Sequence, residues 1–437
     1  MTASTSYRIV EARNPAPTGT PPITSNATNA VRGRRRKLPR VTWLLQLFPV
    51  TTVVLAPYAV LIVPMAVLND NPDVGFIVML LALALPGCLV VELAFLGRMG
   101  RRGEWQRGLA EANAGYPHLF TIARAVVLVS ITADLVSVQA GQGTIFTQIT
   151  GEVASSPAAV VSSLFLGWRY LAFALLVASL LAGRASRLAC LRWTLCLLGT
   201  QLVVGVATAL TAPLMTYLSF LVALAAICGL LHSRFVVVAL MALFLIWPTV
   251  YAARNDLRAG GGVAVDEAMS SADRLRLDLQ VTRASEYDTP VDIERPGPVE
   301  VVRYGLVPRM FDPDRPALST GARINEYLGG TSTSAYTFLS LGTVYFLEGP
   351  WGVVLFHAGW ALVGVLLLRA GGAPGPIRLA VFSFAVAAPL MWSKVYPESM
   401  ILFVQFTVAA LPVLLLLRLS RRRPPSRAAP QHARSGT

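Results

Sequence analysis

The fold class is decided by long apolar runs such as residues 74–97, which read VGFIVMLLALALPGCLVVELAFLG and contain a single acid, Glu92. About 20 apolar residues cross a bilayer as a helix, because a helix satisfies its backbone hydrogen bonds internally. We therefore expect an all-α polytopic membrane protein, in which Glu92 snorkels from the end of its helix. About ten such spans are expected, near residues 42–67, 74–97, 118–140, 163–183, 193–212, 213–231, 235–253, 350–368, 378–393 and 400–418.

The composition excludes a water-soluble single domain. Of the 437 residues, 54% are hydrophobic and 14% are charged, against about 25% charged in an ordinary soluble domain. A disordered chain is excluded as well, because disorder requires low hydrophobicity. In so apolar a chain, the net charge of +14 indicates membrane-flanking loops rather than nucleic-acid binding.

Basic residues set the expected orientation, because the cytoplasmic loops of membrane proteins are enriched in Lys and Arg. With a cytoplasmic N-terminus, the segments on the inner side hold 24 of the 37 basic residues. Both termini are then cytoplasmic. The expected segments are a basic tail (1–40), helices 1–7 (41–253), one large extracytoplasmic loop (254–349), helices 8–10 (350–418) and a second basic tail (419–437).

The extracytoplasmic loop ends in an apolar segment, 336–349, that is too short to span a bilayer. We expect a short interfacial helix there, with Gly349 and Pro350 making the turn into the eighth span. Four arginines precede it within 21 positions: Arg303, Arg309, Arg315 and Arg323. Arg binds phosphate oxygens bidentately and keeps its charge, so the cluster predicts a diphosphate site. The alternative is that these arginines pair with Asp312, Asp314 and Glu326 of the same loop.

Two segments carry a resemblance to a known family. They are Val-Pro-Arg-Met-Phe-Asp-Pro-Asp-Arg-Pro (307–316) and Ser-Leu-Gly-Thr-Val-Tyr-Phe-Leu-Glu-Gly-Pro-Trp-Gly (340–352). Their order, followed by a hydrophobic span, resembles bacterial O-antigen and exopolysaccharide repeat-unit polymerases of the Wzy type, which are membrane glycosyltransferases with a large outer loop late in the chain. The related O-antigen ligases would carry a histidine in that loop, and residues 254–335 contain none.

The resemblance implies an enzyme of the bacterial plasma (inner) membrane that transfers a growing glycan from polyprenyl diphosphate to another lipid-linked unit. Its partners would be the lipid-linked glycan, the lipid bilayer, a flippase and a chain-length regulator. Arginines would stabilise the leaving diphosphate, so no cofactor and no metal ion is expected. The acceptor hydroxyl needs a general base, for which Glu348 at the predicted turn ranks above Glu326 beside the arginines.

Ionisable residues inside the predicted spans form a second candidate set, because such groups are costly in a membrane and are mostly functional or paired. Five fall near the outer helix ends: Asp134, Arg169, Arg254, Lys394 and Glu398. They could line one cavity that opens outward. The alternative is that they snorkel to the interface, above all Lys394 and Arg254.

Two other functions stay open. A polyprenyl-phosphate-sugar-dependent glycosyltransferase of the GT-C type would use an Asp in the first outer loop, where Asp70 and Asp73 lie. A non-enzymatic transporter of lipid-linked sugars would distribute charges through the whole bilayer depth, whereas the charges here are expected to crowd the outer side.

Overall fold

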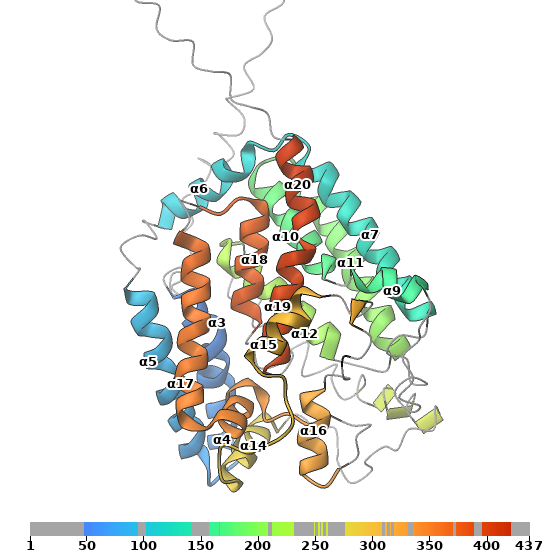
Figure 1. Cartoon of the computed structure of the whole chain (residues 1–437). Coiled ribbons are helices and arrows are strands. Elements are labelled where there is room, and N and C mark those ends of the chain that lie inside the picture. Colours follow the sequence, from blue (N-terminus) through green and yellow to red (C-terminus); the bar gives the residue numbers. More distant parts are fainter. Residues whose placement is uncertain are drawn as a thin grey trace, which may run out of the picture. The chain divides into compact units, whose positions relative to one another are not determined.

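The computed structural model of the chain describes most of residues 48–420, and every element in the described part is helical (Figure 1). The described residues are 48–94, 102–140, 157–165, 167–208, 212–230, 249, 252–253, 255–256, 259–260, 276–307, 311–312, 315, 319–330, 335–369, 373–388 and 396–420. All of them belong to one unit of the chain, Leu38–Thr437.

Six helices in the described part are long and apolar enough to cross a membrane. They are the continuous run of α3 (Pro49–Pro57), η1 (Tyr58–Ile62) and α4 (Val63–Leu68), then α5 (Val74–Leu93), α7 (Leu119–Gln139), α11 (Arg187–Thr208), α17 (Leu339–Arg369), and the run of α19 (Glu398–Ala409) and α20 (Leu411–Ser420). The predicted all-helical membrane class is thus confirmed.

Shorter helices complete the described part. Three of them are apolar and lie where further spans are expected: α10 (Trp168–Leu181), α12 (Ala212–Ile227) and α18 (Pro376–Ala387). The others are α6 (Arg102–Ala114), α9 (Pro157–Ser163), α14 (Leu277–Thr282), η4 (Arg283–Glu286), α15 (Pro298–Leu306) and α16 (Thr320–Tyr327). The expected span 235–253 lies largely outside the described residues, so the total of ten spans stays a prediction.

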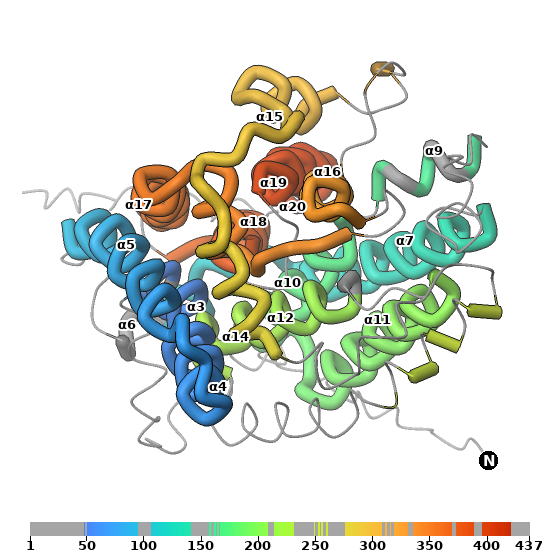
Figure 2. Tube along the Cα trace, turned by 90° about the horizontal axis from the view of Figure 1, so that it is seen from below, coloured from blue at the N-terminus to red at the C-terminus, as the bar shows by residue number. Residues whose placement is uncertain are grey.

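The helix α10 lies at the centre of the bundle (Figure 2). Every residue from Tyr170 to Ser179 is buried, as expected for a helix that is apolar all round. The Tyr170 ring contacts Phe220 of α12 and Phe384 of α18, each at a centroid distance of 5.1 Å. The α10 helix is therefore a core element that other helices surround.

Glu92, the acidic residue of segment 74–97, does not snorkel toward the membrane surface. Glu92 is 1% exposed, and its carboxylate accepts hydrogen bonds from the backbone amides of Val50 and Thr51 at 2.9 and 3.2 Å. These amides belong to the first turn of α3, where the backbone N–H groups have no partner within their own helix. Glu92 therefore caps the neighbouring helix, and the expectation of a snorkelling side chain was wrong.

Segments that the charge pattern assigns to the cytoplasmic side meet at one end of the bundle. Asn113 of α6 donates to the Pro374 carbonyl at 3.4 Å, and Arg184 donates to the Ala114 carbonyl at 2.9 Å. The helix α6 itself falls in a segment that was expected to be a loop. Three predicted inner segments are thus in contact.

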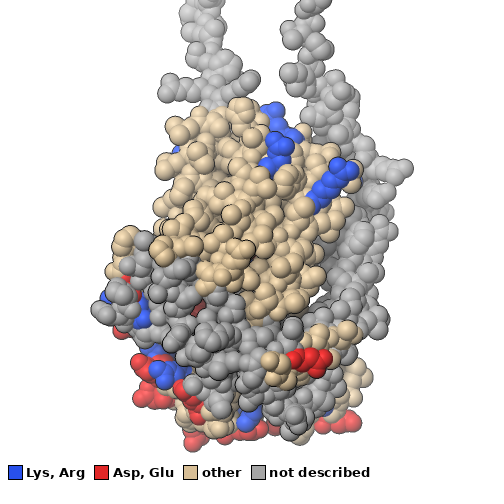
Figure 3. All heavy atoms as spheres, turned by 90° about the vertical axis from the view of Figure 1, so that its right-hand side faces the viewer, with Lys and Arg blue, Asp and Glu red and all other residues tan. Residues whose placement is uncertain are grey.

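The opposite end gathers segments that the charge pattern assigns to the outside, and we call it the loop end. Asn71, between α4 and α5, donates to Asp278 of α14 at 3.0 Å. The backbone amide of Thr320 donates to Glu398 at 2.6 Å. On the face drawn in Figure 3, the Asp and Glu side chains lie at this end together with some Lys or Arg, and the charged side chains toward the other end are Lys or Arg. The segregation agrees with the predicted topology, while the cytoplasmic location of the termini stays a prediction.

Candidate functional site

A break in α17 marks the loop end. Gly349 has φ 68° and ψ −170° inside a helix that otherwise runs from Leu339 to Arg369. This conformation is essentially restricted to glycine, because a side chain would clash with the backbone. The break separates a short segment, 339–348, from a segment that is long enough to span a bilayer, 350–369. The turn predicted at Gly349 and Pro350 is therefore present.

Glu348 lies immediately before the break and is held by side chains from two distant segments, which together we call the Glu348 cluster. Nη2 of Arg295 lies 3.2 Å from Oε1 of Glu348. The Tyr396 side chain adjoins the same carboxylate, and burial together with the nearby negative charge of Glu348 raises the pKa of Tyr396 to about 12. The Glu348 side chain is 30% exposed. It is thus oriented by two partners and still accessible, as a general base must be.

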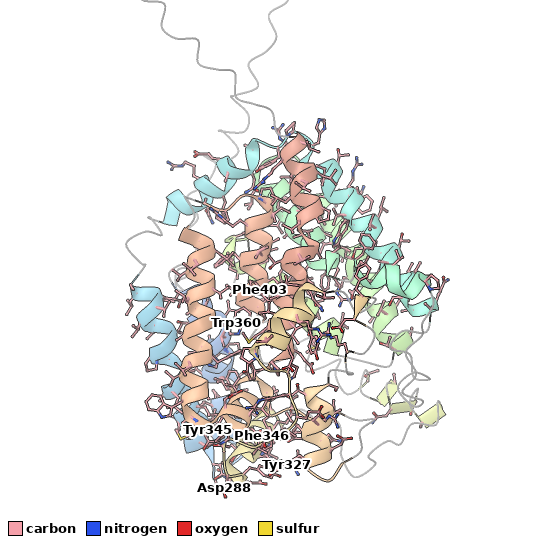
Figure 4. All side chains as sticks on the ribbon, in the orientation of Figure 1. Asp288, Tyr327, Tyr345, Phe346, Trp360 and Phe403 are labelled. Atoms are coloured by element: carbon pink, nitrogen blue, oxygen red, sulfur yellow. The ribbon has the colours of Figure 1, made fainter. Side chains whose placement is uncertain are left out.

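Aromatic rings pack against the segment that carries Glu348. Phe346 is fully buried and contacts the rings of Tyr287 and Tyr327 at centroid distances of 5.4 and 5.7 Å. Tyr327 itself is half exposed. Figure 4 shows Tyr327, Tyr345 and Phe346 near one another at the loop end, close to Asp288. The rings therefore pack the short segment of α17 against the loop, and Tyr327 combines an apolar ring with a polar hydroxyl at a half-exposed position.

The arginine run divides into two groups within the described part of the chain. Arg303 forms an ion pair with Asp312. Arg315 lies over the Tyr304 ring, with its Cζ 4.3 Å from the centroid, and it donates to the Tyr304 carbonyl at 2.8 Å. The first group therefore surrounds α15, which contains both Arg303 and Tyr304.

Arg323 belongs to the second group. Its guanidinium pairs with Glu294 at 3.0 Å and with Glu326 at 3.3 Å. Pairing with loop carboxylates, the alternative to a diphosphate site, thus occurs in both groups. Arg309 lies outside the described residues, so its role stays a prediction.

Two of the membrane-embedded candidates contact each other. Nη1 of Arg169 lies 3.6 Å from Asp134 and donates to Gln201 at 2.8 Å, while Gln201 donates to the second carboxylate oxygen of Asp134. This Asp134 cluster links α10, α7 and α11, and the Asp134 side chain is 1% exposed. Asp134 and Arg169 are therefore paired between helices rather than snorkelling.

Glu398 faces the loop, where its buried carboxylate accepts the backbone N–H of Thr320 at the start of α16. It therefore ties the first turn of α19 to the loop. Arg254 and Lys394 lie outside the described residues. A common cavity lined by all five candidates stays a prediction.

Sequence reasoning missed Arg295, Tyr396 and Gln201. A weak signal was available for the first two, because each directly precedes a proline, as residues in turns and extended segments do. Gln201 gave no signal, because a single amide in an apolar run does not reveal which helix it faces.

Among the described residues, no three His, Cys, Asp or Glu side chains gather into a metal-ion site. Comparison with known proteins gave no match to a family model, a curated protein or a solved structure. The function must therefore be inferred from the geometry and chemistry of the site.

Proposed function

We propose that this protein is a glycosyltransferase that polymerises polyprenyl-diphosphate-linked oligosaccharide units into a polysaccharide. The observation that carries the proposal is the partly exposed Glu348 carboxylate, held by Arg295 and Tyr396 at a break in a membrane helix. Lipid-linked donors and acceptors keep their reacting groups near the membrane surface, where a base at this break would meet them. The positive-inside pattern supports a site on the outer face of the membrane, which we propose is a bacterial plasma membrane.

The reaction requires a base for the acceptor and a stabilised leaving group. The Glu348 carboxylate takes the proton of the acceptor sugar hydroxyl. The hydroxyl oxygen then forms a bond to the anomeric carbon of the donor glycan, and the bond from that carbon to the diphosphate oxygen breaks. Its electron pair leaves with the polyprenyl diphosphate, whose negative charge needs cationic donors nearby.

Side chains elsewhere in the loop and in the following segment are suited to hold these reactants. Tyr396, whose pKa is raised to about 12, is uncharged at neutral pH and therefore adds no negative charge beside Glu348. Arg303 and Arg315 present planar guanidinium groups around α15, and such groups bind diphosphate oxygens bidentately. The exposed ring of Tyr327 offers a surface on which a sugar can stack.

Reconstitution of the purified full-length chain into liposomes tests the proposal. A short-chain polyprenyl-diphosphate-linked oligosaccharide is added, and the products are separated by size. We expect a ladder of lengthened lipid-linked glycans together with free polyprenyl diphosphate. Unchanged substrate in the presence of correctly folded protein would reject the proposed function.

One observation favours a second function. The Asp134 cluster places a carboxylate and a guanidinium group between membrane helices, and ionisable groups inside membrane proteins can mark substrate or ion pathways. A transporter of lipid-linked sugars would move labelled substrate between the leaflets of the same liposomes without lengthening it.

The GT-C-type alternative makes a separate prediction. Asp70 and Asp73 are exposed in the loop between α4 and α5. If Asn at these two positions abolished transfer while Glu348→Gln did not, the catalytic group would belong to that loop and the function to the GT-C type.

A further inference from the structure

The helix α15 lies alongside a membrane span, although its sequence belongs to the large loop. Val301 and Tyr304 of α15 are buried in one cluster with Ile401 of α19. Gly305 meets Val404 so closely that a Cβ at position 305 would lie 2.6 Å from the Val404 Cβ. The two helices are therefore in close contact over at least one turn.

The contact lies well inside the span. Val404 follows Glu398, the first residue of α19, by six positions, which corresponds to about 9 Å along a helix. In Figure 1, α15 lies beside α19 and farther from the loop end than α14 and α16. In Figure 2, it lies outside α17 and α19, at the edge of the bundle. The helix α15 is thus peripheral (Figure 2) and lies beside the second turn of α19, which begins a candidate membrane span.

The face of α15 that points away from α19 carries apolar side chains together with two charged ones, Glu300 and Arg303. Val299, Val302 and Leu306 lie on it at helical spacing, and they are 81%, 51% and 52% exposed. Phe311, shortly after the helix, is 71% exposed. A helix at the surface of a water-soluble loop would instead turn polar side chains outward. An apolar surface of this kind marks contact with a partner or with a membrane.

The backbone at the C-terminal end of α15 is satisfied by side chains. The Tyr304 carbonyl lies in the last turn, where helical carbonyls have no partner within the helix. It accepts hydrogen bonds from Gln405 at 2.9 Å and from Arg315 at 2.8 Å. Gln405 belongs to α19 itself. Protein donors at this place are what a helix end requires where water is excluded.

We propose that α15 is inserted into the bilayer leaflet at the loop end, with lipid acyl chains packed on Val299, Val302, Leu306 and Phe311. Arg303 lies on the same face, where its side chain is 57% exposed and pairs with Asp312, and an Arg at such a place can extend its charged group toward the lipid headgroups. The part of the loop that forms α15 then contacts the membrane. This holds whatever reaction the chain catalyses, because it rests on packing against α19.

Fluorescent labels on single cysteines test the insertion. Val302→Cys and Leu306→Cys are made in a Cys196→Ser background, because Cys196 is exposed and the other three cysteines are buried. The full chain is reconstituted in phosphatidylethanolamine and phosphatidylglycerol vesicles, with or without a nitroxide lipid. Leu415→Cys in α20, which is 58% exposed, is the lipid-facing control. Ser285→Cys, exposed in the loop, is the aqueous control.

We expect the labels at 302 and 306 to be quenched by the nitroxide lipid as strongly as the label at 415, and to resist aqueous iodide. The label at 285 should show the reverse. Iodide quenching at 302 and 306 equal to that at 285, without lipid quenching, would overturn the insertion. Both side chains are exposed, so their replacement removes little packing inside the protein, and either position alone decides the question.

Discussion

The Asp134 cluster and the Glu348 cluster have similar compositions and different surroundings. Each joins a carboxylate to an arginine and to a neutral hydrogen-bonding group, Gln201 in one and Tyr396 in the other. The Asp134 side chain is 1% exposed, whereas that of Glu348 is 30% exposed. The first cluster connects three helices, and the second lies at a helix break.

This difference shows that the Glu348 carboxylate is accessible from outside the protein, whereas the Asp134 carboxylate is enclosed between helices. A buried ion pair is held by its partners, and removing one partner leaves an uncompensated charge. A partly exposed carboxylate can exchange a proton with a substrate without such a penalty. We therefore expect changes in the Asp134 cluster to lower stability, and changes around Glu348 to lower turnover.

The largest effect on stability is expected from Asp134→Ala. It leaves the guanidinium of Arg169 without its carboxylate between helices, which costs about 3–5 kcal/mol. Unfolding in detergent measures the loss. Asp134→Asn keeps the hydrogen-bonding shape toward Gln201 and is the matched control for lost packing. An Ala variant as stable as the wild type would show that the pair does not hold these helices together.

The next prediction is a loss of turnover when an arginine of the first group, Arg315, is replaced. Arg315→Ala removes a planar cation beside α15, and the loss of one transition-state donor typically lowers kcat by about 10²–10³-fold. Arg323→Ala, which breaks exposed ion pairs with Glu294 and Glu326, should lose far less. Rates of chain lengthening in liposomes compare the two. Equal losses would mean that both groups bind the diphosphate.

Gly349→Ala should lower stability by about 1–3 kcal/mol, because an alanine is strained at the φ and ψ of this residue. Gly359→Ala in the same helix is the control, since a Cβ there meets no atom within 4 Å. It should be neutral or slightly stabilising. Thermal unfolding of both variants measures the difference. Equal melting temperatures of the two variants would contradict the predicted strain at Gly349.

The smallest expected effect is a pH dependence of the free energy of unfolding, caused by Asp278. Burial alone would raise its pKa, but hydrogen bonds from Arg276 and Asn71 outweigh burial and hold it below the ordinary value, which is about 3.9. The ionised form therefore stabilises the fold above about pH 4, and this contribution is lost as the pH falls through the lowered pKa. The free energy of unfolding, measured as the pH is lowered below about 4, should decrease. Asp278→Asn should remove this part of the pH dependence.

Much of the fold could be predicted, because apolar runs of 20 residues have few alternatives to spanning a bilayer. The break at Gly349 was predictable for a similar reason, since Gly-Pro cannot continue a helix unchanged. The cap formed by Glu92 was not, because an acid near a helix end looks the same whether it meets water or a neighbouring helix. The proposed insertion of α15 could not be predicted either, because the sequence does not show which face of this helix packs against α19.

The candidate site could be predicted only in part. Glu348 was identifiable from its place at the predicted turn. Its partners Arg295 and Tyr396 come from segments far away in the sequence, and only the folded loop brings them to the carboxylate. The pairing of Arg323 with Glu326 lies within one helical turn and was therefore visible as an alternative.

The central claim is that Glu348 is the general base, and Glu348→Gln tests it most directly. The variant keeps the side-chain shape, so lipid-linked substrate should bind with wild-type affinity while the rate of chain lengthening falls by about 10²–10⁴-fold. Glu326→Gln, the matched control in an exposed ion pair, should retain most of the rate. Wild-type lengthening by a folded Glu348→Gln protein would contradict the account.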